Sequence, residues 1–276
     1  MSKKIVPDPK AMPFLRWAGG KRQLTSALLK RVPNGFAGHY VEPFLGAGSL
    51  FFALAPEKSI LSDVNPRLID VYRQIKMNPY AVRKELQRHI RLHSIEHYYK
   101  TRDDYNRGAL SAAQAGRFIY LNKACFNGIF RVNRKGEFNV PKGSKDKLFT
   151  PLKQEFDLIS SRLGKAKLLA EDFEVVLGRV SKNDFIYLDP PYPALNGTAY
   201  FTHYTADRFD ERSQERLAKC VYRVNNSGAR FLMSNADTKT IRSLYRGFQV
   251  EEIPVTRFVS CKGIRAAASE LLIRNY

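Results

Sequence analysis

The sequence is poor in cysteine and lacks long apolar runs. Its 276 residues include three cysteines, Cys125, Cys220 and Cys261, whose odd number and wide spacing indicate reduced, buried thiols and not a disulfide framework. No apolar run approaches the ~18 residues of a membrane-spanning helix. The N-terminal MSKKIVPDPK lacks the apolar segment of a signal peptide. These absences predict a cytoplasmic protein without membrane association.

Acidic residues are scarce relative to basic ones. The chain has 46 Lys+Arg against 26 Asp+Glu, a net charge of +20. Such an excess predicts a polyanionic partner, nucleic acid before membrane. A hydrophobic content of 44%, with 12% aromatics, supports a folded core and argues against disorder.

Several short apolar runs have the pattern of strands, and helical patterns separate most of them. The runs span residues 39–44, 59–64, 167–172, 184–190, 229–236, 249–259 and 268–276. The last two, joined by the turn-rich SCKGIRA, predict an antiparallel hairpin. Alternating strands and helices indicate an α/β fold, so we expect a mixed seven-stranded sheet.

A stretch in the middle of the chain interrupts this alternation. Residues 76–165 are helical and basic in pattern and then contain the polar, hairpin-like FRVNRKGEFNVP. We therefore expect a catalytic domain built from residues 1–75 and 166–276, with an inserted domain at 76–165.

Three histidines of this stretch have a spacing that can bind zinc. His89, His93 and His97 recur every fourth residue on an expected helix. Their basic neighbours Arg88 and Arg91, and the lack of a carboxylate at zinc-protease spacing, argue against a metal. We predict a solvated or DNA-facing basic helix and no metal site.

Two glycines lie where the first strand passes into a helix. In EPFLGAGS, Gly46 and Gly48 allow a ligand to approach the backbone closely. Asp63 follows near the ~20-residue spacing expected of a carboxylate that binds ribose hydroxyls. Phe51 stands where a dinucleotide-binding motif has its third glycine, so the pattern favours a nucleoside ligand. A plain tight turn is the alternative explanation.

The stretch NDFIYLDPPYP puts Asp189 directly after a buried apolar run. Pro190 and Pro191 cannot continue a sheet ladder, so the strand must end there. The chain thereby holds one carboxylate, one proline carbonyl and the ring of Tyr192 at the C-terminal end of a strand.

Four motifs in this order, RWAGGK, EPFLGAGS, SDVN and DPPY, resemble those of the D12-class (Dam-like) DNA adenine-N6 methyltransferases. EDF at 171–173 and FNGIFRVNRKGEFNVPKG in the middle also match, so the resemblance covers nearly the whole chain. DPPY alone also occurs in cytosine-N4 and in RNA or protein amide methylases. The middle stretch is much more specific to this family.

The resemblance implies a fold, a cofactor and a reaction. The fold is the sheet of methyltransferases that use S-adenosylmethionine (AdoMet), with an inserted, mainly helical DNA-recognition domain bearing a β-hairpin. The reaction is site-specific methyl transfer to N6 of an adenine flipped out of double-stranded DNA. Asp189 and the Pro190 carbonyl would accept from the amine, whose delocalised lone pair makes it a poor nucleophile, while Tyr192 stacks on the base. No metal is needed.

The resemblance also implies which residues bind the cofactor. Lys21 would lie near the methionine carboxylate, Asp63 would hold the ribose hydroxyls, and Asp172 would accept from the adenine amine. The implied set is Trp17, Lys21, Pro43, Phe44, Gly46, Gly48, Asp63, Asp172, Phe173 and Asp189.

The implied DNA-binding residues lie in the middle stretch, where a two-stranded ribbon turning at Lys135 and Gly136 would enter the major groove. Arg131 would recognise the guanine of GATC by donating hydrogen bonds to guanine O6 and N7. The implied set is Asn127, Ile129, Arg131, Asn133, Arg134, Lys135, Asn139, Pro141, Lys142 and Lys145.

Two other functions stay open on the sequence. One is the same chemistry on cytosine N4 or on adenine in RNA. The other is a DNA-binding module that has lost catalysis, although intact DPPY and GAG argue against it. For the favoured interpretation we expect a monomeric, nucleoid-associated enzyme that acts on double-stranded DNA. The sequence does not decide whether a cognate restriction endonuclease accompanies it.

Overall fold

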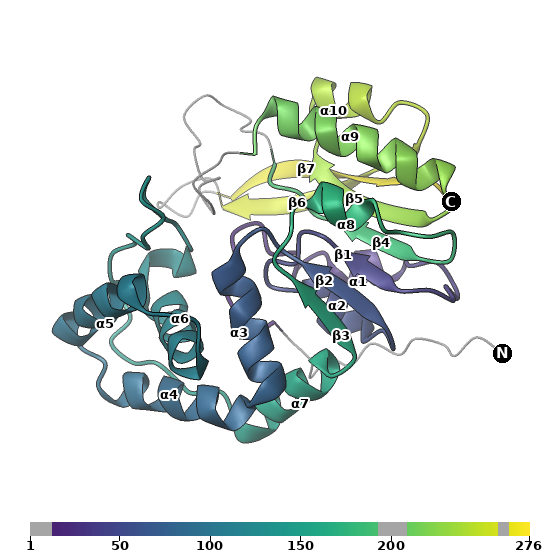
Figure 1. Ribbon diagram of the computed structural model, residues 1–276. Coiled ribbons are helices and arrows are strands. Elements are labelled where there is room, and N and C mark those ends of the chain that lie inside the picture. Colours follow the sequence, from purple (N-terminus) through teal and green to yellow (C-terminus); the bar gives the residue numbers. More distant parts are fainter. Residues whose placement is uncertain (1–12, 193–208, 259–264) are drawn as a thin grey trace.

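The computed structural model describes residues 13–192, 209–258 and 265–276 of the chain (Figure 1). Its centre is a seven-stranded sheet in the order β3-β2-β1-β4-β5-β7-β6. The strands are β1 (Tyr40–Glu42), β2 (Ser59–Ser62), β3 (Ala166–Leu169), β4 (Phe185–Leu188), β5 (Arg230–Ala236), β6 (Gln249–Phe258) and β7 (Arg265–Arg274). Each overlaps one of the predicted runs, which confirms the predicted strands.

The sheet is mixed because one strand runs against the others. β1 pairs in parallel with β2 and β4, β2 with β3, and β4 with β5. β7 is antiparallel to both β5 and β6, which confirms the predicted terminal hairpin. Most of the connecting stretch SCKGIRA, including Cys261, lies outside the described residues. Cys125 and Cys220 are buried free thiols, as predicted.

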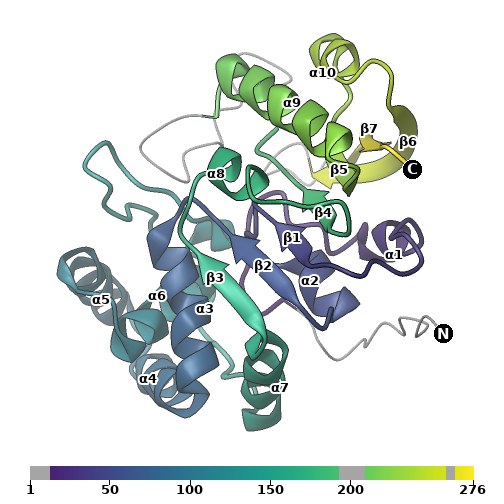
Figure 2. The same ribbon diagram turned by 45° about the vertical axis from the view of Figure 1, so that its right-hand side comes forward.

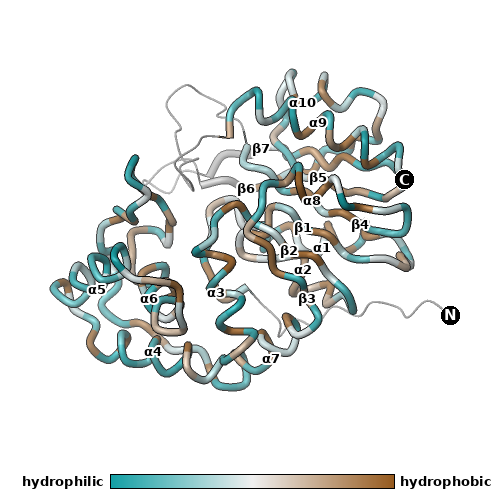
Figure 3. Tube along the Cα trace, in the orientation of Figure 1, coloured by the Kyte–Doolittle hydropathy of each residue, from teal (hydrophilic) through white to brown (hydrophobic). Residues whose placement is uncertain are grey.

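Helices cover both faces of the sheet (Figures 1 and 2). In β1, Tyr40 faces one helical layer and Val41 the other, because successive side chains of a strand alternate. Figure 3 shows hydrophobic residues along the strands between these layers. One layer holds α1 (Thr25–Leu29), α2 (Ser49–Leu54) and α3 (Pro66–Met77), and the other holds α8 (Phe173–Leu177), α9 (Glu211–Asn226) and α10 (Lys239–Leu244).

The start of α3 shows how the sequence positions a site residue. The side-chain oxygen of Asn65 accepts from the backbone N–H groups of Arg67 at 3.1 Å and Leu68 at 3.2 Å. Pro66 occupies the first turn, where its missing N–H is not needed. This cap fixes the junction between β2 and α3, and Asp63 lies in that junction.

Between α3 and β3 the chain forms a group of helices beside the sheet (Figure 1). These are α4 (Pro79–Arg91), α5 (Ile95–Arg107), α6 (Ala112–Ala124) and α7 (Lys153–Leu163). α6 packs on α3, α4 and α5, while α7 packs on α3 and α4. Buried aromatic rings, among them Tyr98, Tyr105, Phe118 and Tyr120, fill this group.

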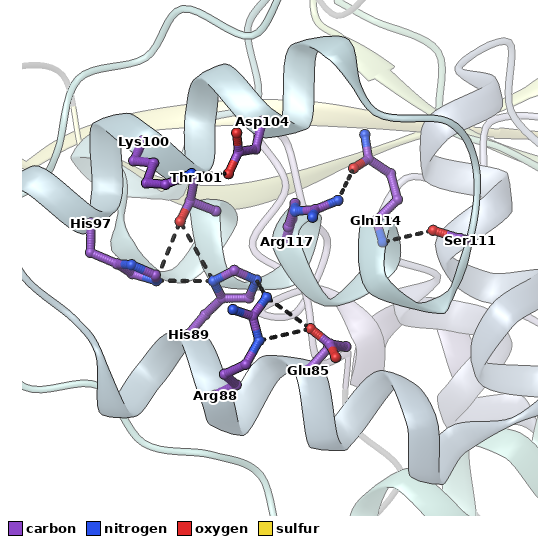
Figure 4. A network of polar contacts seen from close by, with 10 residues as sticks. All are labelled: Glu85, Arg88, His89, His97, Lys100, Thr101, Asp104, Ser111, Gln114 and Arg117. Carbon is purple, nitrogen blue, oxygen red and sulfur yellow. Dashed lines mark hydrogen bonds and ion pairs between the residues drawn. The ribbon is translucent and has the colours of Figure 1, made fainter.

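The predicted solvated or DNA-facing histidine helix is wrong. α4 ends at Arg91, and Ser94 starts α5 by accepting from the His97 N–H at 3.0 Å. His89 and His97 then meet between the two helices, with 3.0 Å between His89 Nδ1 and His97 Nε2 (Figure 4). Both rings pack against Tyr120, as does His93. Burial lowers the pKa of His89 to about 3, so this buried imidazole is neutral near pH 7.

The predicted hairpin is present, although only isolated bridges pair its two arms. Val132 bridges Phe138, and the Gly136 N–H donates to the Asn133 carbonyl at 2.9 Å. Gly136 has a φ of +76°, a left-handed conformation that favours glycine. The turn therefore includes the predicted Lys135 and Gly136. A short 3-10 helix, η1 (Phe126–Gly128), precedes it.

Candidate active site

The predicted cofactor residues gather at the carboxyl edge of the parallel strands. Gly46 and Gly48 follow β1, Asp63 follows β2, Asp172 follows β3 and Asp189 follows β4. Because the strand order is β3-β2-β1-β4, these ends are neighbours. The chain continues from β1 to β2 and from β4 to β5, in opposite directions across the sheet. Open α/β sheets bind ligands at such a switch point.

The glycine turn after β1 is tightly packed. Gly46 and Gly48 have left-handed φ angles of +46° and +67°. A Cβ atom on Gly46 would lie 2.8 Å from Cδ1 of Trp17. The Trp17 ring also stacks on Phe130 and Phe118, with ring centres 5.4 and 6.4 Å away. Trp17 therefore joins the turn to α6 and the hairpin.

Asp63 is oriented by this turn. Its two carboxylate oxygens accept from the backbone N–H groups of Gly46 and Asn65, each at 3.0 Å. These bonds use two of the roughly four lone-pair positions of a carboxylate. Burial raises the pKa of Asp63 to about 6, while the two N–H groups favour the charged form. In its charged form the group can accept from two further hydroxyls.

Aromatic rings and one carboxylate lie together beside β1 and β3. Phe44 stacks on Phe173 with ring centres 5.4 Å apart, and Phe209 meets Phe44 edge-on at 5.7 Å. Asp172 caps α8 with one oxygen, and its other oxygen accepts from Arg216 at 2.7 Å. The Arg216 guanidinium also lies 4.6 Å from the centre of the Phe173 ring. The sequence did not point to Arg216.

Asp189 is held by one of its two oxygens. Lys21 Nζ and Ser234 Oγ both lie 2.8 Å from Oδ1. No residue in the described ranges donates to Oδ2 or to the Pro190 carbonyl. Burial raises the pKa of Asp189, and the ammonium of Lys21 opposes that rise. The site thus has two acceptor groups directly after β4.

Lys21 and Tyr192 complete the cluster around Asp189. Lys21 is 5% exposed, and its Nζ also donates to the Gly19 carbonyl at 2.8 Å. The same ammonium lies 4.5 Å from the centre of the Tyr192 ring. In this structure Lys21 therefore contacts Asp189 and Tyr192 of the DPPY motif. Its contact with a methionine carboxylate stays a prediction.

Arg131 is exposed on the hairpin, and a neighbouring side chain orients it. Its Nε donates to Asn139 Oδ1 at 2.9 Å, while no described residue takes a hydrogen bond from its two terminal nitrogens. Asn127, in η1, has a φ of +54° and is also exposed. Arg134 and Lys135 are exposed at the turn. The structure brings these candidates for DNA contact onto one connected segment.

The chain matches the model of a known family. The family is described as D12 class N6 adenine-specific DNA methyltransferase, and the match spans residues 17–258. The chain belongs to this family. The relatives of this D12-class enzyme include the type II methyltransferase M.MjaIII of Methanocaldococcus jannaschii, 38% identical over 96% of this chain and 99% of the relative. The type II methyltransferase M1.LlaDCHI of Lactococcus lactis is 35% identical over 96% and 95%. A DNA adenine methylase of Vibrio cholerae is 35% identical over 94% of each chain.

Membership makes the chain a DNA adenine-N6 methyltransferase built on the mixed methyltransferase sheet. Within the described ranges, no group of His, Cys, Asp and Glu side chains is placed to hold a metal. In those same ranges, no helix combines the length and apolarity needed to span a membrane.

Sequence motifs did not reveal several residues that build this D12-class site. Asn122 of α6 accepts from the Arg16 N–H at 2.9 Å and donates to the Arg16 carbonyl at 2.7 Å. Asn106 of α5 pairs in the same way with both backbone groups of Phe138. Ser234 lies inside a buried strand and reads as core. Only their partners, far away in sequence, show what these side chains do.

Proposed function

We propose that this enzyme uses AdoMet to methylate N6 of an adenine that it flips out of double-stranded DNA, within GATC. The observation that carries the catalytic part is the geometry of Asp189. Its Oδ1 is occupied by Lys21 and Ser234, which leaves Oδ2 and the Pro190 carbonyl as acceptors for the two hydrogens of one amine. Tyr192 provides a ring beside them, on which a base can stack.

The cofactor residues fit AdoMet on physical grounds. The Gly46 turn permits close approach to the backbone, and Asp63 has lone pairs for two ribose hydroxyls. The pair of Phe44 and Phe173, next to the Asp172 carboxylate, suits an adenine ring and its amine. Bound there, AdoMet supplies the methyl group on its sulfonium. Because Arg216 also uses Asp172, the two donors would share this carboxylate.

The amine of adenine is a weak nucleophile, because its lone pair is delocalised into the ring. Two acceptors that bind its hydrogens draw the nitrogen toward a tetrahedral shape and stabilise the positive charge that develops on it. Asp189 and the Pro190 carbonyl supply these acceptors in a fixed position. The Pro191 carbonyl, which accepts from the buried Gln214 at 3.0 Å, anchors the same loop. The rate gain we propose comes from positioning and electrostatics.

Arg131 supports recognition of guanine. Since Asn139 engages only its Nε, both terminal nitrogens can donate to O6 and N7 of one guanine. Asn127 and Ile129 border the target base in this arrangement.

Duplexes with one GATC, and duplexes with one base of that site changed, test the proposal. We expect methyl transfer to the GATC duplex only. The variant Arg131→Ala should lose ~1–3 kcal/mol of the free-energy difference between guanine and another base at that position. It should still bind random DNA nearly as well as the wild type does. If Arg131→Ala lowers transfer without altering sequence preference, the arginine contacts phosphate and the guanine assignment is wrong.

Base flipping has its own test. With 2-aminopurine at the target position, fluorescence should rise on binding, because a flipped base is unstacked.

A further inference from the structure

A buried glutamate lies beside the partly exposed Asp189. Glu270 belongs to β7, is 8% exposed, and pairs in register with Ala236 of β5. It comes from the far end of the sequence and from no recognised motif.

Glu270 contacts Tyr192 of the DPPY motif directly and is linked to Asp189 of that motif through Lys21. The Tyr192 hydroxyl donates to Glu270 Oε2 at 2.8 Å. Lys21 Nζ lies 2.8 Å from Asp189 Oδ1 and 4.0 Å from Glu270 Oε2. On the other side of Asp189, Ser234 Oγ is 3.1 Å from the Tyr187 hydroxyl. One polar chain thus runs from the sheet through Asp189 and Lys21 to Glu270 and Tyr192.

The charged groups in this row of polar contacts depend on one another. Two carboxylates in a low-dielectric site repel each other, and a shared ammonium makes both tolerable. Lys21 is buried between them, so its position fixes the distance between Asp189 and Glu270. The Tyr192 ring, tied to Glu270 by its hydroxyl, is fixed in the same frame.

We propose that Glu270 is a positioning residue for methyl transfer. It anchors the Tyr192 hydroxyl and shares Lys21 with Asp189, so that the stacking ring and the amine acceptor keep one relative position. The inference rests on the proposed roles of Asp189 and Tyr192, but not on the recognised sequence being GATC.

A double-mutant cycle on the purified full-length enzyme tests the hydrogen bond. Tyr192→Phe keeps the ring and removes the hydroxyl, while Glu270→Ala removes its acceptor. Each should lower kcat about tenfold, as the loss of a hydrogen bond to a charged group does. The double variant should be no more than about twofold slower than the slower single variant. AdoMet affinity should stay near that of the wild type, and so should every parameter of Glu252→Gln, an exposed glutamate of the adjacent β6.

Glu270→Gln separates charge from shape, since its amide oxygen can still accept from Tyr192. Among the described residues, the titratable groups that interact with the charge of Asp189 include Lys21, Glu270, Glu42, Tyr40, Tyr187 and Tyr192. The charge of Glu270 raises the pKa of Asp189, so its removal should move the acid limb of the kcat–pH profile to lower pH. A glutamate whose charge does not act on Asp189 would leave that limb in place.

Two results would overturn the inference. One is a double variant whose defect is the product of the single defects, about a hundredfold. The other is an acid limb in Glu270→Gln that stays unchanged or moves upward. If the wild type methylates adenines outside GATC, the proposed recognition sequence fails, but the cycle can still be measured on the DNA that it does methylate.

Discussion

At the scale of single residues, Asp63 gives the cofactor site a pH dependence. Burial raises its pKa to about 6, so the carboxyl takes up a proton as the pH falls through that value. A protonated carboxyl loses its charge and one acceptor position. We predict that AdoMet affinity, measured by calorimetry, falls about tenfold between pH 7 and pH 5, because the ionised fraction falls by about that factor.

The matched variant is Asp63→Asn, which should bind AdoMet more weakly and with little pH dependence. Equal pH profiles for the two proteins would assign the effect to another group. The effect on folding has the opposite sign. The folded chain binds this proton more tightly than the unfolded chain does, so ionisation of Asp63 lowers stability as the pH rises from 3.8 to about 6.

Asp189 carries the prediction for catalysis. Asp189→Ala removes an acceptor that is fixed before the reaction begins, so the methylation rate should fall by at least ~10²-fold. AdoMet affinity should change little, because the ribose and adenine contacts that we propose lie elsewhere. A variant that keeps more than a tenth of the wild-type rate would show that Asp189 is not the principal acceptor.

Residues in motifs could be predicted from sequence, and residues that act through distant partners could not. Asp63 and Asp189 were expected at strand ends from the local sequence, and Asp172 from the family resemblance; the structure places each after a strand, and their roles stay predictions. The contact between Lys21 and Asp189 was not predicted, because the two residues are far apart in the sequence. Ser234 and Glu270 were missed because a polar residue within an apolar strand has no local mark of its role.

At the scale of elements, the hairpin depends on α5. Asn106 satisfies both backbone groups of Phe138, at 2.8 and 3.1 Å. Asn106→Ala leaves these groups without that partner, so the free energy of unfolding should fall by about 1–3 kcal/mol. DNA affinity should fall with it, and AdoMet affinity should not. Lys100→Ala, on the exposed side of the same helix, should change stability little in the same urea titration. If both variants unfold alike, the hairpin does not depend on this anchor.

The success of element prediction followed the strength of local patterns. The strands could be predicted because their apolar runs end at proline, glycine or acidic residues. The histidine helix failed for a complementary reason. Ser94 is a strong cap for a new helix, and it interrupts the four-residue spacing that suggested a single one.

At the scale of the whole molecule, the net charge of +20 should dominate the salt dependence of DNA binding. Exposed cations on the hairpin and the loop after it, including Arg131, Arg134, Lys135 and Lys145, are the proposed phosphate and base contacts. We predict that log K falls linearly with log salt concentration, with a slope near −0.9 per phosphate neutralised. Arg134→Ala should make that slope shallower by about one unit, whereas Lys219→Ala, on the exposed face of α9, should not. Binding that is flat between low and physiological salt would contradict this interface.

The site joins residues that are far apart in the sequence, so the sequence alone could not show how they are arranged. The strand order places the ends of β1 and β4 side by side, although most of the chain, including the helical group, separates them in sequence. Trp17 then joins the glycine turn to Phe130 of the hairpin. The cofactor site and the proposed DNA-contacting segment are therefore parts of one packed unit.

Sequencing with base-modification detection, on DNA from cells that express the enzyme, tests the proposed function most directly. We predict N6-methyladenine at the adenine of GATC on both strands, and none of it in cells that express Asp189→Ala. N4-methylcytosine, or N6-methyladenine confined to a different sequence, would contradict the proposal.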